Sequence, residues 1–129
     1  IRDLAASLFR SYKSKSAAID LKINIDDVSL DVNAAVPCGL IINELVSNAL
    51  KHAFPTGSKG EIYISLFATT EQKLVLIVSD NGVGLPNNLN FHNTESLGLQ
   101  LVNSLATQLR GNVELTSRGG TEVKLTFAN

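Results

Sequence analysis

Apolar and polar positions follow two different periods along this chain, and these periods predict its first elements. Apolar residues recur at helical spacing over residues 1–13, which predicts an amphipathic helix. Residues 21–25 alternate between apolar and polar, the pattern of a half-buried strand. We also expect a short extended piece at Leu30 and Val32.

A long helix is predicted in the middle of the chain. Asn33 is a suitable N-cap, and Pro37 is expected in the first turn, where a missing N–H is tolerated. We expect the helix to run to about Phe54, because Pro55 and Gly57 stop it there.

The remaining sequence predicts two strand pairs separated by one helix. The expected strands are 61–68, 73–79, 113–116 and 121–127, and the expected helix is 97–109, stopped by Gly111. The second of these strands is apolar on both faces and should be central. This order predicts an α+β fold, a two-layer α/β sandwich with helices on one face of a mixed, mainly antiparallel sheet.

Composition narrows the class of protein. A chain of 129 residues is long enough for one two-layer domain. Its net charge of -1 gives no electrostatic reason to expect nucleic acid or an anionic membrane as a partner. The single Cys38 excludes an internal disulfide, favours a reducing cytoplasm and is expected to be a buried filler. Because the first residue is not Met, we expect the chain to be a piece of a longer protein.

Candidate chemistry begins on the long helix. Glu44 and Asn48 are four residues apart and lie on one helix face, and Lys51 lies near it. An Asn carbonyl suits Mg²⁺, a Glu can orient or deprotonate a nucleophile, and a Lys supplies charge for phosphate. From spacing alone, a solvated face of an amphipathic helix is the favoured interpretation of these residues.

A second stretch changes that balance. Asp80 ends a buried strand, where an unpaired carboxylate is costly, so it needs donors such as the exocyclic amine of a purine. Gly82 and Gly84 allow the backbone to approach a flat ligand closely. A tight turn after the strand is the alternative interpretation of the same residues.

Two later segments have the same dual character. Leu97, Gly98 and Leu99 open a helix, and its first N–H groups suit a polyphosphate, although an ordinary helix start looks the same. Thr121 follows two glycines at the start of the last strand, where its hydroxyl can hydrogen-bond a carboxylate or a water beside a base. A simple hairpin turn is the alternative there.

Taken together, these elements resemble the ATP-binding domain of sensor histidine kinases. That domain belongs to the GHKL superfamily (Bergerat fold), which includes DNA gyrase and MutL. The similarity covers the chain from about Leu21, through the segment 43–54 (NELVSNALKHAF), the D-x-G-x-G motif at 80–84 and Gly119-Gly120-Thr121.

The resemblance implies a role for each matching residue. It makes Asn48 the magnesium ligand, Glu44 the acidic catalytic residue and Asp80 the acceptor from the adenine amino group. It places Lys51, as a second catalytic residue, beside the phosphates, and Thr121 behind the aspartate. The other residues implied in ATP binding are His52, Gly82, Gly84, Leu85, Leu97, Gly98 and Leu99, and residues 87–97 correspond to a short lid.

The resemblance also implies cofactors, partners and a place for the chain. ATP and Mg²⁺ are the expected cofactors, and the phosphate is expected to pass to a histidine of a separate dimerisation domain and then to a response regulator. Residues 17–129 would form the catalytic domain, with no direct membrane contact. Residues 1–16 would be the end of the linker from the dimerisation domain, although a helix that packs on the sheet edge fits the same pattern.

Three other functions remain open at this level. They are a nucleotide-gated dimerisation clamp of the gyrase type, an anti-sigma serine kinase, and a non-catalytic nucleotide-binding scaffold. Neither the longer N-terminal arm nor the second domain of the clamp proteins is visible, and the matching residues Glu44, Asn48 and Asp80 argue against the scaffold.

Overall fold

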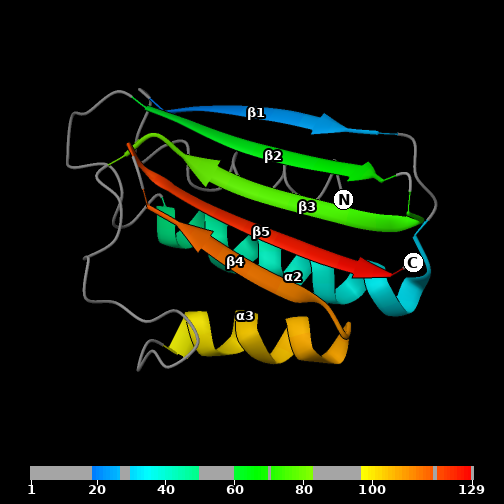
Figure 1. Cartoon of the computed structure of the whole chain (residues 1–129). Coiled ribbons are helices and arrows are strands. Elements are labelled where there is room, and N and C mark those ends of the chain that lie inside the picture. Colours follow the sequence, from blue (N-terminus) through cyan, green and yellow to red (C-terminus); the bar gives the residue numbers. More distant parts are fainter. Residues whose placement is uncertain are drawn as a thin grey trace.

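The computed structural model describes the chain at residues 19–26, 30–49, 60–69, 71–82, 97–117 and 119–128. Two helices and five strands lie within these residues (Figure 1). In chain order they are β1 (Ile19–Ile25), α2 (Val32–Asn48), β2 (Gly60–Ala68), β3 (Lys73–Asp80), α3 (Leu97–Gln108), β4 (Asn112–Thr116) and β5 (Thr121–Ala128).

The strands form one mixed sheet in the order β1-β2-β3-β5-β4. Only the β1–β2 pair is parallel among the described strands, and the β2–β3, β3–β5 and β4–β5 pairs are antiparallel. The apolar strand β3 is central, as its sequence predicts. The predicted α+β sandwich with a mainly antiparallel sheet is therefore confirmed.

Both described helices cover the same face of the sheet (Figure 1). The register places Ile64 of β2, Val78 of β3 and Val123 of β5 on that face, and all three are buried. Ile42 and Val46 of α2 and Val102 of α3 complete the core from the helical side. The inward-facing apolar side chains of the strands thus pack against the inner surface of both helices.

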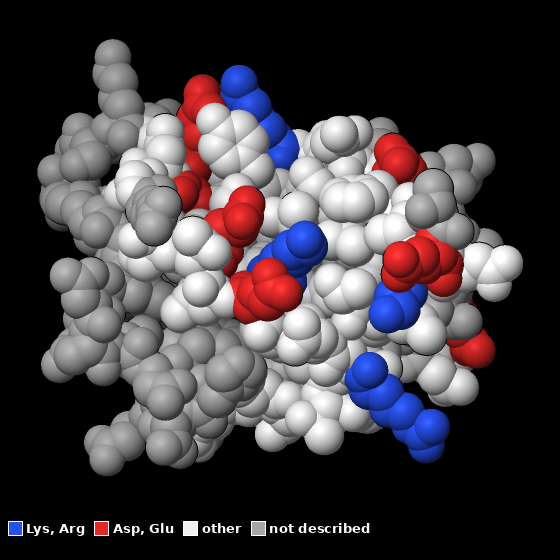
Figure 2. Space-filling view, in the orientation of Figure 1, with Lys and Arg blue, Asp and Glu red and all other residues white. Residues whose placement is uncertain are grey.

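The opposite face of the sheet is more polar. Figure 2 shows acidic and basic side chains dispersed among uncharged ones on this side of the molecule. Lys124 of β5 lies opposite Glu114 of β4 in the strand register, an arrangement of opposite charges that favours the pair. The described charges on this face are therefore of mixed sign.

The start of α2 differs from the sequence prediction. Asp31, not Asn33, is the N-cap: its side chain accepts a hydrogen bond from the Asn33 N–H at 3.1 Å. Val32 is therefore the first helical residue, and the expected extended piece at Leu30 and Val32 is wrong. Pro37 consequently lies in the second turn instead of the first, so the helix lacks the hydrogen bond that this residue would donate to the Asn33 carbonyl.

The end of α3 is a Schellman motif with a non-glycine residue in the left-handed conformation. Arg110 has φ +55°, and its N–H donates to Thr107, while the Gly111 N–H donates to Ala106. Gly111 is needed for a different reason: a Cβ there would lie 2.8 Å from a methyl carbon of Leu125. The helix therefore ends near Gly111, as predicted, but the residue in the left-handed conformation is Arg110.

Other sequence predictions lie outside the described residues. They include the helix over 1–13 and the continuation of α2 beyond Ala49 to Phe54. Within the part of the chain that the structure describes, no helix combines the length and apolar character that crossing a membrane requires.

The buried state of Cys38 gives a direct test of the core. Its side chain is fully buried, and burial raises the pKa of the thiol to about 11. At pH 8 only about one thiol in a thousand would be ionised even if a reagent reached it. We expect Ellman's reagent to modify the native protein far more slowly than the urea-unfolded protein, and equal rates would contradict the described packing of α2.

Candidate functional site

The functional residues predicted from sequence come together at one end of the sandwich. The C-terminal ends of α2 and β3 and the N-terminal ends of α3 and β5 all lie at the same edge, on the left of Figure 1. This follows from antiparallel connections, since α3 runs back along α2 and β5 runs back along β3. Residues near 44–48, 80–82, 97–99 and 121 therefore share one end of the molecule.

Glu44 and Asn48 lie on α2 between residues that belong to the core. Leu45 and Val46 are buried, whereas the side chains of Glu44 and Asn48 are only partly buried. The helix thus places its apolar side against the sheet and directs these two polar groups away from the core centre. The structure confirms that they share a face, as the four-residue spacing predicts.

Gly98 brings the start of α3 against both of these side chains. A Cβ on Gly98 would lie 2.7 Å from Glu44 Oε2 and 3.6 Å from Asn48 Nδ2. A separation under 3.0 Å is closer than a real Cβ contact allows, so any larger residue would have to displace the carboxylate. Because Gly98 has no side chain, the start of α3 lies close to both the carboxylate and the amide.

Leu97 is the first residue of α3, and Leu99 belongs to the core. The Leu99 side chain is thus directed to the sandwich interior, and its suggested contact with a nucleotide stays a prediction. Backbone N–H groups at the start of α3 lie where the helix dipole favours an anion.

Asp80 is the last residue of β3 and lies on the helix-facing side of the sheet. Its register partners are Ile62 on β2 and Thr121 on β5, and Ile62 is completely buried. The carboxylate is half-buried, because it closes the strand at the edge of the core.

The Asp80 carboxylate is surrounded by main-chain donors. Its Oδ1 accepts a hydrogen bond from the Gly82 N–H at 2.9 Å, and the backbone N–H of Thr121 also donates to it. Burial raises the pKa of Asp80, and these two hydrogen bonds partly oppose that rise. The contact of Thr121 with Asp80 thus comes from its backbone, and the role suggested for its hydroxyl stays a prediction.

The glycines before Thr121 were expected only as turn residues, and one of them does more. Gly120 has φ +131°, and a Cβ on it would overlap the carbonyl oxygen of Asp80. The contact between Gly120 and Asp80 depends on the register of β3 and β5, which the sequence does not give. The only local signal for a close approach of the two backbones is the position of Gly120 directly before Thr121.

The remaining site predictions fall outside the described residues. These are Lys51, His52, Gly84, Leu85 and the lid residues before Leu97. Within the described residues there is no group of three or more His, Cys, Asp or Glu side chains that could hold a metal by itself. A metal that binds mainly through phosphate and water needs no such group, and the oxygens of Asn48 and Glu44, both beside Gly98, fit that kind of site.

Comparison with known proteins identifies the family of the chain. Residues 33–129 match the family model described as "Histidine kinase-, DNA gyrase B-, and HSP90-like ATPase". The chain is 32% identical over 104 residues to blue-light-activated histidine kinase 2 of Erythrobacter litoralis, a match that covers 81% of this chain and 30% of the relative. It is 34% identical over 117 residues to the sensor histidine kinase PdtaS of Mycobacterium tuberculosis, covering 84% of this chain and 23% of that protein.

Solved structures show the same fold. The blue-light-activated histidine kinase EL346 of Erythrobacter litoralis superposes with a TM-score of 0.86 at 26% identity, covering 97% of this chain and 42% of that one. The catalytic domain of histidine kinase ThkA superposes with a TM-score of 0.74 at 21% identity, covering 99% of this chain and 92% of that domain. From the family match and these relatives, the chain belongs to the family of histidine kinase-, DNA gyrase B- and HSP90-like ATPases.

Proposed function

We propose that this chain is the ATP-binding catalytic domain of a sensor histidine kinase. It would bind Mg-ATP and transfer the γ-phosphate to a histidine on a separate dimerisation domain, from which a response regulator receives it. The observation that supports this most strongly is Asp80, a half-buried carboxylate aimed by two backbone N–H groups at the end of the sheet where Glu44, Asn48 and Gly98 also lie. The names of the matched relatives favour a histidine as the acceptor over the other members of the superfamily.

The base end of the nucleotide would bind at Asp80. Asp80 would contribute to ATP affinity through a charge-assisted hydrogen bond, in which the 6-amino group of adenine donates and the carboxylate accepts. The Gly82 N–H and the Thr121 N–H hold the carboxylate in place without using its full accepting capacity.

The phosphate end would bind between α2 and the start of α3. Asn48 would supply an oxygen to Mg²⁺, which neutralises charge on the phosphates. The backbone N–H groups that begin α3 would face the anion. Glu44, beside Gly98, would accept the proton of the incoming histidine, and Lys51 would contribute positive charge.

Positioning supplies most of the rate in such a transfer, so the acceptor must be delivered to this end of the domain. We propose that residues 1–16 are the end of the linker from the dimerisation domain and that the domain works in the cytoplasm, where ATP and response regulators are found. The isolated chain would then bind Mg-ATP with little turnover.

Asp80→Asn tests the base end. We expect ATP affinity to fall by about 10- to 150-fold, the value of a hydrogen bond to a charged group, while the far-ultraviolet circular dichroism spectrum is unchanged. Isothermal titration calorimetry measures the affinity, and Asp20→Asn, at an exposed position of β1, is the matched control. Unchanged ATP affinity in Asp80→Asn would remove the basis for the assignment.

The same substitution should not destabilise the empty domain. The pKa of Asp80 is raised in the folded state, so its ionisation at neutral pH costs folding free energy, and that cost disappears as the pH falls through the folded pKa. We expect the unfolding free energy of Asp80→Asn to be at least that of the wild type at pH 7. Any excess over the wild type should disappear as the pH falls. Urea unfolding at several pH values measures this, and a large loss of stability at pH 7 would contradict it.

Asn48→Ala tests the metal role. Removing the amide oxygen should bring the ATP affinities measured with and without magnesium closer together, because the protein no longer contributes a ligand to the ion. Asn24→Ala, at an exposed position of β1, is the control for a lost Asn elsewhere. A magnesium dependence equal to that of the wild type would show that Asn48 is not the ligand.

A further inference from the structure

We propose that Asn81 is a positioning residue for nucleotide recognition: together with Gly120 it fixes the Asp80–Asn81 peptide and thereby aims the Asp80 carboxylate at the base. This inference rests on the proposed function, since it concerns the same end of the site. It gives a role to Asn81 and Gly120, neither of which contacts the nucleotide in the proposed function.

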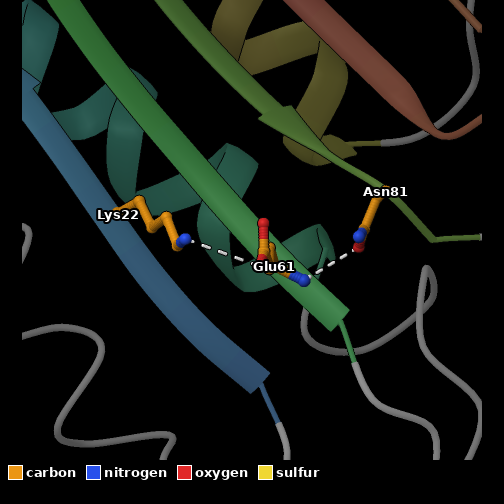
Figure 3. Close-up of polar contacts among 3 residues, drawn as sticks. All are labelled: Lys22, Glu61 and Asn81. Atoms are coloured by element: carbon orange, nitrogen blue, oxygen red, sulfur yellow. Dashed lines mark hydrogen bonds and ion pairs between the residues drawn. The ribbon is translucent and has the colours of Figure 1, made fainter.

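The Asn81 side chain completes the β2–β3 ladder after the strand has ended. Its Oδ1 accepts a hydrogen bond from the Glu61 N–H at 2.8 Å (Figure 3). Its own backbone N–H donates to the Glu61 carbonyl at 3.3 Å. Ile62 pairs with Asp80 in the register, so Glu61 and Asn81 are the next opposed pair. In an antiparallel ladder such a pair exchanges two main-chain bonds.

Here one of those two main-chain acceptors is replaced by a side chain. Because Oδ1 of Asn81 takes the place of its carbonyl oxygen, the carbonyl is released from the ladder and the chain can turn out of the sheet at once. Gly82 then bends back, and its N–H donates to Asp80. The substitution of a side-chain oxygen thus satisfies the Glu61 N–H and permits the turn that holds the carboxylate.

The anchor of this arrangement is the backbone of Glu61, not its charge. Its carboxylate lies 3.6 Å from Lys22 Nζ, but the two side chains are 31% and 58% exposed (Figure 3). An ion pair this exposed contributes little. The Glu61 backbone, in contrast, belongs to β2, which is paired on both sides by β1 and β3.

Gly120 holds the same peptide from the β5 side. A Cβ there would lie 2.8 Å from the Asp80 carbonyl carbon and 2.9 Å from the Asn81 Cα, in addition to its overlap with the Asp80 oxygen. This close approach places Thr121, the next residue, where its N–H donates to the carboxylate. The two donors to Asp80 thus each follow a positioning residue directly in the chain: Gly82 follows Asn81, and Thr121 follows Gly120.

Two substitutions at Asn81 separate positioning from simple stabilisation. Asn81→Leu keeps the approximate size and removes the acceptor, whereas Asn81→Asp keeps an accepting oxygen. The first readout is the ratio of affinities for ATP and for purine riboside triphosphate, which lacks the 6-amino group. The second is the hydrogen-exchange rate of the Gly82 amide, measured by NMR on the protein without nucleotide.

We expect Asn81→Leu to reduce the affinity ratio by about tenfold, the equivalent of one lost hydrogen bond, and to accelerate exchange at Gly82. Asn81→Asp should retain most of the wild-type ratio and slow exchange. A merely structural role would lower the unfolding free energy of Asn81→Leu and leave both readouts of the folded protein unchanged. That result would overturn the proposal.

The adjacent glycines provide a matched pair for the other side. Both have positive φ, +61° at Gly119 and +131° at Gly120, but a Cβ on Gly119 would meet nothing within 4 Å. We expect Gly120→Ala to reduce the affinity ratio or to prevent folding, and Gly119→Ala to leave the ratio unchanged. Equal ratios in a folded Gly120→Ala variant and in the wild type would count against the role of Gly120.

The wild-type measurements distinguish this inference from the function on which it rests. If the wild type binds ATP and purine riboside triphosphate equally well, the adenine contact of Asp80 is wrong, and the positioning proposal falls with it. If the wild type prefers ATP and Asn81→Leu shows the same preference, only the positioning proposal is wrong.

Discussion

Because successive side chains of β3 point to opposite faces, the run that buries Leu74, Leu76 and Val78 also directs Asp80 toward the helical layer. A shift of the strand by one residue would turn Asp80 to the outer face, but it would also turn Leu74, Leu76 and Val78 away from the helices. The hydrophobic effect thus fixes the direction of the one group that is least suited to burial. Hydrogen bonds from Gly82 and Thr121 then make that position tolerable, and the raised pKa shows that they do not offset the cost fully.

The two ends of the site are built by different means. At the proposed phosphate end, Glu44, Asn48 and Gly98 are brought together by the packing of α2 against α3. At the proposed base end, Asp80 is positioned by strand register and backbone hydrogen bonds. Substitutions should therefore act through contact at the first end and through the path of the backbone at the second.

Much of this fold follows from local sequence pattern, because the strands alternate and the helices have apolar stripes. The features that the sequence does not predict depend on competition between neighbouring residues or on the register of the strands. Asp31 and Asn33 are both good N-caps, and pattern alone does not choose between them. The left-handed residue that ends α3 is Arg110, next to the glycine that would normally adopt that conformation, because Gly111 is needed for packing on Leu125.

The same reasoning explains why Glu44, Asn48 and Asp80 stand out as candidates in the sequence, whereas the roles proposed for Asn81 and Gly120 do not. Helical spacing and a strand-ending acid are local signals. The pairing of Asn81 with Glu61 joins positions twenty residues apart, and the contact of Gly120 with Asp80 joins two strands across a helix and a further strand. In the sequence, both residues also fit ordinary turns. Only the sheet register shows that the Asn81 side chain takes the place of a main-chain acceptor for the Glu61 N–H. The residues proposed to accept or neutralise charge are thus apparent in the sequence, and those proposed to aim them are apparent only in the fold.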